Sequence, residues 1–349
     1  MKLYVKTASE NTAKHPVIGS KTHKFNLLLK TGFGGGKMII SASRRTDIPC
    51  YYAKWFLNRL RDGYVYVRNP MNPHQVSKIS LSSDVVDGIV FWTKNPAPML
   101  DRLDALRDYP YYFQFTLTPY DKDIERNLPS KQERIIPVFQ KLSSLIGKER
   151  VVWRYDPILL SAKYTMRYHK KQFRMLCDQL AGCTEKCTIS FLDLYKNMKY
   201  HIAPFGIRPP SFEEAEELAA CFHEITAKHG ISIDTCAEEM DLSTYGIGHA
   251  ACIDRNRLER IGNYRLHVEK DKNQRATCGC VSSIDIGAYN TCKNGCVYCY
   301  ANFNQTLVRN CSGQHDPDSP LLYGKITAQD SINPKEMKSF QREQLTLFE

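Results

Sequence analysis

From Met38 onward the chain alternates short apolar runs with longer amphipathic stretches. Runs rich in Val, Ile, Phe, Tyr and Thr predict β-strands at residues 38–43, 64–69, 88–93, 111–118, 150–155, 187–194 and 231–236, with an eighth near 280–286. Most are apolar almost throughout rather than at every second position. That pattern is typical of parallel strands covered on both faces.

Amphipathic stretches at residues 130–145, 166–180 and 211–229 predict helices between these strands. The last is the clearest, because Ser211 and Glu214 have the spacing of a capping box ahead of an apolar face. Strand and helix in alternation predict an α/β fold built from βαβ units, and eight strands predict a TIM-like (β/α) barrel. Functional groups of such a barrel lie where its strands end.

The number and placement of the cysteines say more about function than the overall composition does. The chain has thirteen cysteines, and only Cys50 lies in the first half. The N-terminus shows no secretion signal, so metal binding is favoured over a disulfide framework. No apolar run is long enough to span a bilayer. We therefore expect a cytoplasmic, metal-binding protein with no membrane partner.

Cys292, Cys296 and Cys299 form a C-x-x-x-C-x-x-C motif, with Tyr298 just before the last cysteine. Thiolates are the usual ligands of iron–sulfur clusters, and three of them would leave one iron of a cubane open. The motif resembles the signature of the radical S-adenosylmethionine superfamily, and the string CVYCYA resembles its spore photoproduct lyase branch. The resemblance implies a [4Fe–4S] cluster, S-adenosylmethionine as cofactor, a 5′-deoxyadenosyl radical, and an electron donor such as flavodoxin or ferredoxin.

The motif lies near the C-terminal end of the chain, whereas in that superfamily it follows the first barrel strand. A circularly permuted barrel would resolve the difference if residues 280–286 paired with residues 38–43. The segments SASRRTDIP, FWTKNP, WRYDPI, SFLDLY and CAE, followed by the cysteine motif, resemble a bacterial and archaeal family called domain of unknown function 1848. That resemblance runs from Met38 to about Gly324 and implies no established activity.

Two further interpretations of the cysteines stay open. Cys296 and Cys299 could form half of a zinc knuckle, although zinc sites want four ligands. Four other cysteines could ligate a second iron–sulfur cluster or a zinc ion: Cys236, Cys252, Cys278 and Cys280. Alternatively, Cys236 and Cys252 are buried apolar residues, as free cysteines often are.

Polar residues at predicted strand ends are candidates to bind S-adenosylmethionine. Lys94 or Arg154 would supply a cation for its carboxylate. Asn95, Asp156 and Glu238 would accept hydrogen bonds from its ribose and amino groups. The alternative for each is a salt bridge or hydrogen bond at the barrel rim.

The net charge of +11 is unevenly distributed. Residues 1–37 hold seven lysines, no arginine and one acidic residue, Glu10, so they carry +6 and the remainder only +5. The back-translated sequence before Met38 is purine-rich, like a ribosome-binding site. We therefore expect residues 1–37 to be a non-core extension and residues 38–324 to form one barrel, with a cysteine-rich region at 236–311.

Residues 325–349 are polar and predict a flexible C-terminal tail. Within it, residues 344–348, with Gln344, Leu345, Leu347 and Phe348 as the contact positions, resemble the pentapeptide with which bacterial polymerases and repair proteins dock on the DNA sliding clamp. The alternative is a small hydrophobic patch that packs the C-terminus onto the barrel. Three functions follow as hypotheses: a radical enzyme that repairs or modifies nucleic acid, a radical enzyme for a small molecule or peptide, and a non-catalytic, metal-stabilised protein that binds nucleic acid or the clamp.

Overall fold

An eight-stranded, all-parallel sheet organises the computed structural model, which describes residues 38–195, 198–337 and 339–341. In spatial order its strands are β10 (Ile284–Asp285), β1 (Ile39–Ala42), β4 (Gly88–Thr93), β5 (Tyr111–Thr116), β6 (Val151–Ile158), β7 (Lys186–Phe191), β8 (Ser232–Thr235) and β9 (Gly248–His249). The α/β class and the parallel sheet are confirmed.

Helices connect these strands, as the amphipathic pattern predicts. The α-helices are α1 (Ile48–Tyr51), α2 (Ala53–Asp62), α3 (Ile136–Ile146), α4 (Met166–Leu180), α5 (Lys199–Ile202), α6 (Phe212–Ala227), α7 (Arg255–Gly262) and α8 (Gln305–Gly313). Shorter 3-10 or π turns are η1 (Ala97–Leu106), η2 (Lys131–Ile135), η3 (Lys148–Arg150), η4 (Ala203–Phe205) and η5 (Ser243–Tyr245). The capping box at the start of α6 is present, with Ser211 and Glu214 bonded reciprocally.

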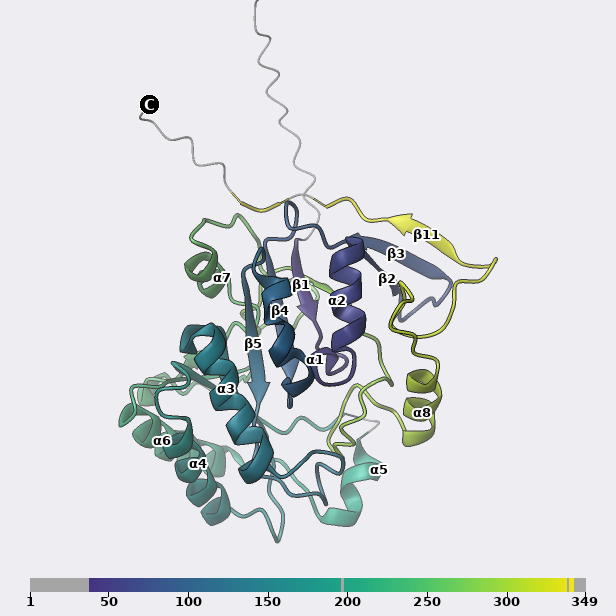
Figure 1. Cartoon of the computed structure of the whole chain (residues 1–349). Helices are drawn as coiled ribbons and strands as arrows, with labels where there is room; N and C mark the ends of the chain where they lie inside the picture. Colours follow the sequence, from purple (N-terminus) through teal and green to yellow (C-terminus); the bar gives the residue numbers. More distant parts are fainter. Residues whose placement is uncertain (1–37, 196–197, 338, 342–349) are drawn as a thin grey trace, which may run out of the picture. The chain divides into compact units, whose positions relative to one another are not determined.

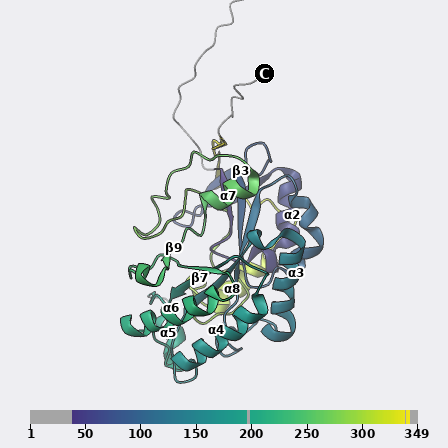
Figure 2. The same cartoon turned by 90° about the vertical axis from the view of Figure 1, so that its left-hand side faces the viewer.

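The two faces of the sheet carry different layers. Helices α2, α3, α4 and α6 cover one face, and the segment that contains α7 lies against the other (Figures 1 and 2). Toward the helices, alternate strand residues such as Phe91 and Trp153 join the main core. On the opposite face, Val90, Tyr112 and Val152 pack with residues 252–281. Successive strand residues therefore point to opposite faces of the sheet, one set toward the helices and the other toward residues 252–281.

The predicted pairing of the motif strand with the N-terminal strand is confirmed. β10 runs parallel to β1, with Ile40 opposite Ile284 and Ser41 opposite Asp285. The all-parallel sheet is compatible with a (β/α) barrel, and its order places β10, which precedes the cysteine motif, next to β1.

One strand prediction needs correction, because residues 64–69 do not join the main sheet. Residues 64–69 do contain a strand, β2 (Tyr64–Arg68), but it pairs antiparallel with β3 (Gln75–Ser80) in a separate sheet of order β11-β3-β2. The eighth strand of the main sheet is instead β9, which lies beside β8 and is only two residues long. Within the described residues, β9 and β10 form the two edges of the main sheet, and no ladder joins them.

The described part of the expected tail is structured. Strand β11 (Ser331–Pro334) pairs with β3, and the backbone N–H of Phe340 donates to Asp87 over 2.6 Å. Residues 1–37 and 342–349 lie outside the described residues, as do the clamp-motif residues Gln344, Leu345, Leu347 and Phe348. Of the helices that are described, none has the length and apolar character needed to cross a membrane.

Candidate metal and cofactor site

A cavity of about 580 Å³ lies where the parallel strands end. Its walls come from the carboxyl ends of β1, β4, β5, β6, β7, β8 and β10 and from the loops that follow them. All seven cysteines singled out in the sequence line it: Cys236, Cys252, Cys278, Cys280, Cys292, Cys296 and Cys299. Thiols from residues up to 63 positions apart in the sequence therefore line the same cavity.

The three-cysteine loop is held by the segment that follows β5. Cys296 forms an antiparallel bridge with Glu125, and the N–H of Val297 donates to the carbonyl of Ile124 over 3.0 Å. The N–H of Asn127 donates to the carbonyl of Asn294 over 3.1 Å. The motif is therefore fixed by backbone pairing to a second chain segment.

Asp47 joins β1, β4 and the cysteine loop. Its carboxylate caps α1 by accepting from the N–H of Cys50 at 3.1 Å, and it also accepts from the N–H of Lys94 at 2.8 Å. The side-chain amide of Asn294 donates to it over 3.2 Å. One buried carboxylate thus sets the relative positions of three elements at the cavity.

A buried network surrounds Glu125 beside Cys296. Its carboxylate accepts from Lys94 Nζ at 2.7 Å and from Thr118 Oγ1 at 2.8 Å, and it contacts Lys131 Nζ and the hydroxyl of Tyr298. Burial alone would raise the pKa of Glu125, but the two lysines outweigh it and hold the pKa at about 2. Lys94 is therefore engaged with protein groups while it lines the cavity.

The three thiols influence one another electrostatically. Burial raises the pKa of Cys292 and Cys296 to about 12, and that of Cys299 to about 11. Each is thus a neutral thiol in a protein without bound metal. A soft cation would have to displace these protons, which is the usual linkage between metal binding and thiol ionisation.

Arg154 and Asp156 lie on β6 and line the cavity beside Cys252. Arg154 Nε donates to Asp156 Oδ2 over 3.0 Å, and its Nη1 lies 2.9 Å from Cys252 Sγ. Asp156 also accepts from the hydroxyl of Ser190. Burial would raise the pKa of Asp156, yet the Arg154 guanidinium holds it below its usual value. A fixed carboxylate therefore faces the cavity.

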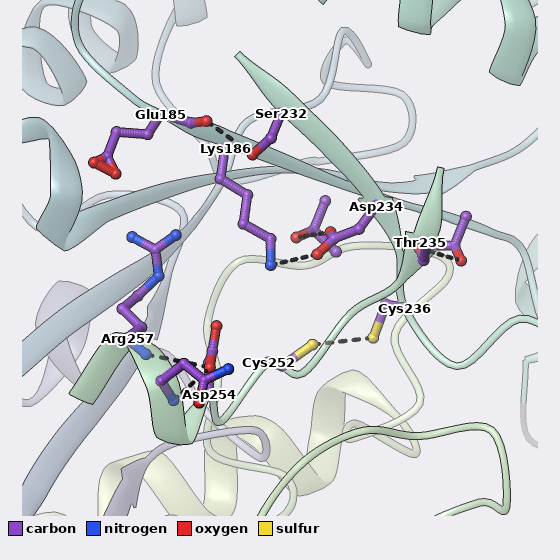
Figure 3. A network of polar contacts seen from close by, with 12 residues as sticks. Glu185, Lys186, Ser232, Asp234, Thr235, Cys236, Cys252, Asp254 and Arg257 are labelled. Carbon is purple, nitrogen blue, oxygen red and sulfur yellow. Dashed lines mark hydrogen bonds and ion pairs between the residues drawn. The ribbon is translucent and has the colours of Figure 1, made fainter. Parts of the chain in front are cut away.

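The other four cysteines form a chain of sulfur contacts. Cys236 Sγ lies 3.1 Å from Cys252 Sγ, and the two side chains point toward each other (Figure 3). Cys252 is hydrogen-bonded to Cys280, and Cys280 to Cys278. The backbone N–H of Ile253 donates to Cys280 Sγ over 3.3 Å. All four thiols therefore lie within one continuous cluster.

The structure separates the five predicted cofactor contacts into two groups. Lys94, Arg154 and Asp156 line the cavity, whereas Asn95 and Glu238 do not. Asn95 Oδ1 accepts from the N–H of Ala97 at the start of η1, and Glu238 Oε1 accepts from the N–H of Phe191 at 2.8 Å. Asn95 thus stabilises its own turn, and Glu238 ties the segment after β8 to the end of β7.

Asp47, Glu125 and Asp285 were not among the predicted site residues. Asp47 follows a predicted strand, so the strand-end rule points to it. Glu125 lies in an irregular segment and gives no such signal. In the described part of the chain, no group of three or more His, Cys, Asp or Glu side chains is arranged closely enough to hold a metal ion, so either metal site would require side-chain rotation on binding.

The fold and the site together define a parallel α/β protein with a cysteine-lined cavity at the carboxyl ends of its strands. The chain belongs to the family described as domain of unknown function (DUF1848), whose model matches residues 39–301. The match includes the three-cysteine motif and ends two residues after Cys299. Neither a curated protein nor a solved structure matches the chain.

Proposed function

We propose that this protein is a radical S-adenosylmethionine enzyme whose Cys292, Cys296 and Cys299 hold a [4Fe–4S] cluster. The observation that carries the proposal is the convergence of these three thiols on the cavity, on a loop that follows a strand paired with β1. Three soft donors fit three irons of a cubane and leave the fourth open. The cavity volume is within the usual range for a small-molecule site.

Cys292, Cys296 and Cys299 would hold the cluster, which would supply the electron for reductive cleavage of S-adenosylmethionine to methionine and a 5′-deoxyadenosyl group able to take a hydrogen atom from the substrate. The electron would come from a small carrier such as flavodoxin or ferredoxin. The loops that line the cavity at the carboxyl ends of the strands would limit the access of water to the radical.

The chain's own residues have two roles in this proposal. Lys94, with its charge compensated by Glu125, positions the loop around Cys296. Asp156, held by Arg154 and Ser190, offers carboxylate oxygens to the amino or ribose hydroxyl groups of the cofactor. Arg154 acts mainly by orienting Asp156.

Nucleic acid is the substrate class we propose. Its support is the clamp-like sequence Gln344–Phe348 in the C-terminal tail. Attachment to the sliding clamp would raise the local concentration of DNA without a strongly basic surface. A small molecule or a peptide is the other substrate class, and failure of the tail to bind the clamp would favour it.

Anaerobic reconstitution with iron and sulfide tests the chemistry. After reduction in the presence of S-adenosylmethionine, the native chain should release 5′-deoxyadenosine, and Cys296→Ala should release none. Cys311→Ala is the matched control, because Cys311 does not line the cavity. No release above the Cys296→Ala background would overturn the radical proposal. Zinc without iron at this motif would favour the non-catalytic binding protein instead.

A further inference from the structure

The proposed cluster leaves four cysteines of the cavity without a role: Cys236, Cys252, Cys278 and Cys280. They come from the two open edges of the main sheet. Cys236 follows β8 and Cys252 follows β9, whereas Cys278 and Cys280 precede β10. Because β9 and β10 are each two residues long, the pairing at either edge is weak by itself.

From this arrangement we infer that the four cysteines bind one zinc ion, which links the β8–β9 edge to the segment leading into β10. Four thiolates complete the tetrahedral coordination of zinc and leave no open position, as in structural sites. The ion would join the parts of the curved sheet that no ladder connects in the described residues. This inference goes beyond the proposed radical chemistry and does not depend on it.

The spacing of the sulfurs favours a single ion. Tetrahedral zinc with Zn–S bonds of about 2.3 Å places its thiolates about 3.8 Å apart. Cys236 Sγ and Cys252 Sγ are 3.1 Å apart, and the other two thiols continue the same chain of hydrogen bonds. The side chains are not in a tetrahedral arrangement without the ion, and metal binding would have to rotate them around a common centre. A cluster of several irons needs its thiolates farther apart than this.

The backbone around the four cysteines is built for close approach. The N–H of Gly279 donates to the carbonyl of Ala250 over 3.3 Å, and a Cβ at residue 279 would lie 3.0 Å from that oxygen. The N–H of Val281 donates to the carbonyl of Ile253 over 3.1 Å. The Cys-Gly-Cys segment therefore lies directly against residues 250–253, and Gly279 permits that contact.

Hydrogen-bond donors and cations around the sulfurs suit a thiolate site. The N–H of Ile253 donates to Cys280 Sγ, and Arg154 Nη1 donates to Cys252 Sγ. Four thiolates and one Zn²⁺ carry −4 + 2 = −2. Arg154 and Arg44 interact electrostatically with Cys252, and Arg44 Nη2 is buried with no hydrogen-bond partner in the described residues. Arg154 shares its charge with Asp156, whereas the unbonded Nη2 of Arg44 leaves a buried guanidinium that a negatively charged site would compensate.

Metal analysis of the full chain tests the inference. The decisive protein is the triple variant Cys292→Ala, Cys296→Ala and Cys299→Ala, which cannot hold the proposed iron–sulfur cluster. We expect it to retain one zinc ion per chain. We expect Cys278→Ser and Cys280→Ser to lose zinc while keeping iron at the three-cysteine motif. Cys177→Ser, at a buried position away from the cavity, is the control and should keep both metals.

A second measurement covers the case in which a serine variant does not fold. In the folded triple variant, a chelator should remove zinc and make four additional thiols reactive toward an alkylating reagent. Mass spectrometry should locate them at Cys236, Cys252, Cys278 and Cys280. The inference is overturned if the triple variant binds no zinc, if these positions carry iron, or if the newly reactive thiols lie elsewhere. Failure of 5′-deoxyadenosine release would overturn only the radical proposal.

Discussion

Ser41 and Asp285 face each other across the pairing of β1 with β10. Ser41 Oγ donates to Asp285 Oδ2 over 2.7 Å, and the two residues are direct partners in the parallel register. Asp285 also accepts from Ser43 Oγ at 2.6 Å and from the N–H of Arg44 at 2.8 Å. One carboxylate therefore joins the strand before the cysteine motif to the loop at the entrance of the cavity.

Replacement of that carboxylate should weaken the pairing. In Asp285→Asn, an amide group faces several donors that need acceptors, and we expect the free energy of unfolding to fall by about 2–4 kcal/mol. Ser41→Ala removes a single hydrogen bond and should lose about 1 kcal/mol. Urea denaturation of the two variants measures the difference. An Asp285→Asn protein as stable as the native chain would show that Asp285 does not hold β10 in place.

Glu125 should matter more for stability than an exposed acidic residue. Glu125→Gln would leave Lys94 and Lys131 buried without their carboxylate partner, so we expect a loss of about 3–5 kcal/mol. Adding Lys94→Met and Lys131→Met should recover much of the loss, because no buried charge then remains. Denaturant melts of the single and triple variants would decide the point. An equally unstable triple variant would mean that packing, not charge, dominates at this site.

The sequence predicts the strand pairing at this site better than it predicts the contacts made there. The position of the cysteine motif required β10 beside β1, and the structure has this pairing. The apolar run of β2 was recognised, but its antiparallel partner could not be, because apolar periodicity does not identify a partner strand. β9 escaped detection because two residues have no measurable period.

Side-chain contacts across long sequence separations were the least predictable. Glu125 meets Cys296 about 170 residues away, and no local pattern marks that contact. Asn95 and Glu238 follow strands as the candidates should, yet local backbone geometry directs them elsewhere. Asn95 caps the turn at Ala97, and Ala237 has a positive φ of 56° just before Glu238. Strand-end position therefore predicts proximity to the cavity but not the direction of a side chain.

His169 should make folding sensitive to mild acid. It is fully buried, with Nε2 2.8 Å from the carbonyl of Leu159 and Nδ1 2.8 Å from the hydroxyl of Tyr155. Nε2 therefore donates and Nδ1 accepts, which requires the neutral ring. Burial lowers the pKa of His169 from 6.5 to about 4. The neutral ring stabilises the fold fully above pH 6.5, and this contribution is lost as the pH falls toward 4.

Between pH 6.5 and 4, the free energy of unfolding should fall by about 3 kcal/mol in total. In this range His169 is protonated in the unfolded chain but not in the folded one, and each pH unit therefore favours unfolding by about 1.4 kcal/mol. His169→Gln cannot titrate, so the difference in unfolding free energy between the native chain and this variant should shrink as the pH falls. Urea melts at several pH values between 7 and 4 would measure that difference. A constant difference would contradict the assignment, because other titrating groups are common to both proteins.

The C-terminal tail should bind the DNA sliding clamp through its apolar side chains. A peptide of residues 341–349 is expected to bind purified clamp, since Leu345, Leu347 and Phe348 can fill an apolar groove while Gln344 sets the register. Leu347→Ala with Phe348→Ala should reduce affinity by at least tenfold, about 1.4 kcal/mol. Thr346→Ala is the matched control and should bind as the native peptide does. Surface plasmon resonance with the peptide and with the full chain would compare the native and variant affinities.

If the native tail does not bind, the proposal of a nucleic-acid substrate loses its main support, and a small-molecule or peptide substrate becomes the better proposal. The tests of the two metal sites do not depend on this result.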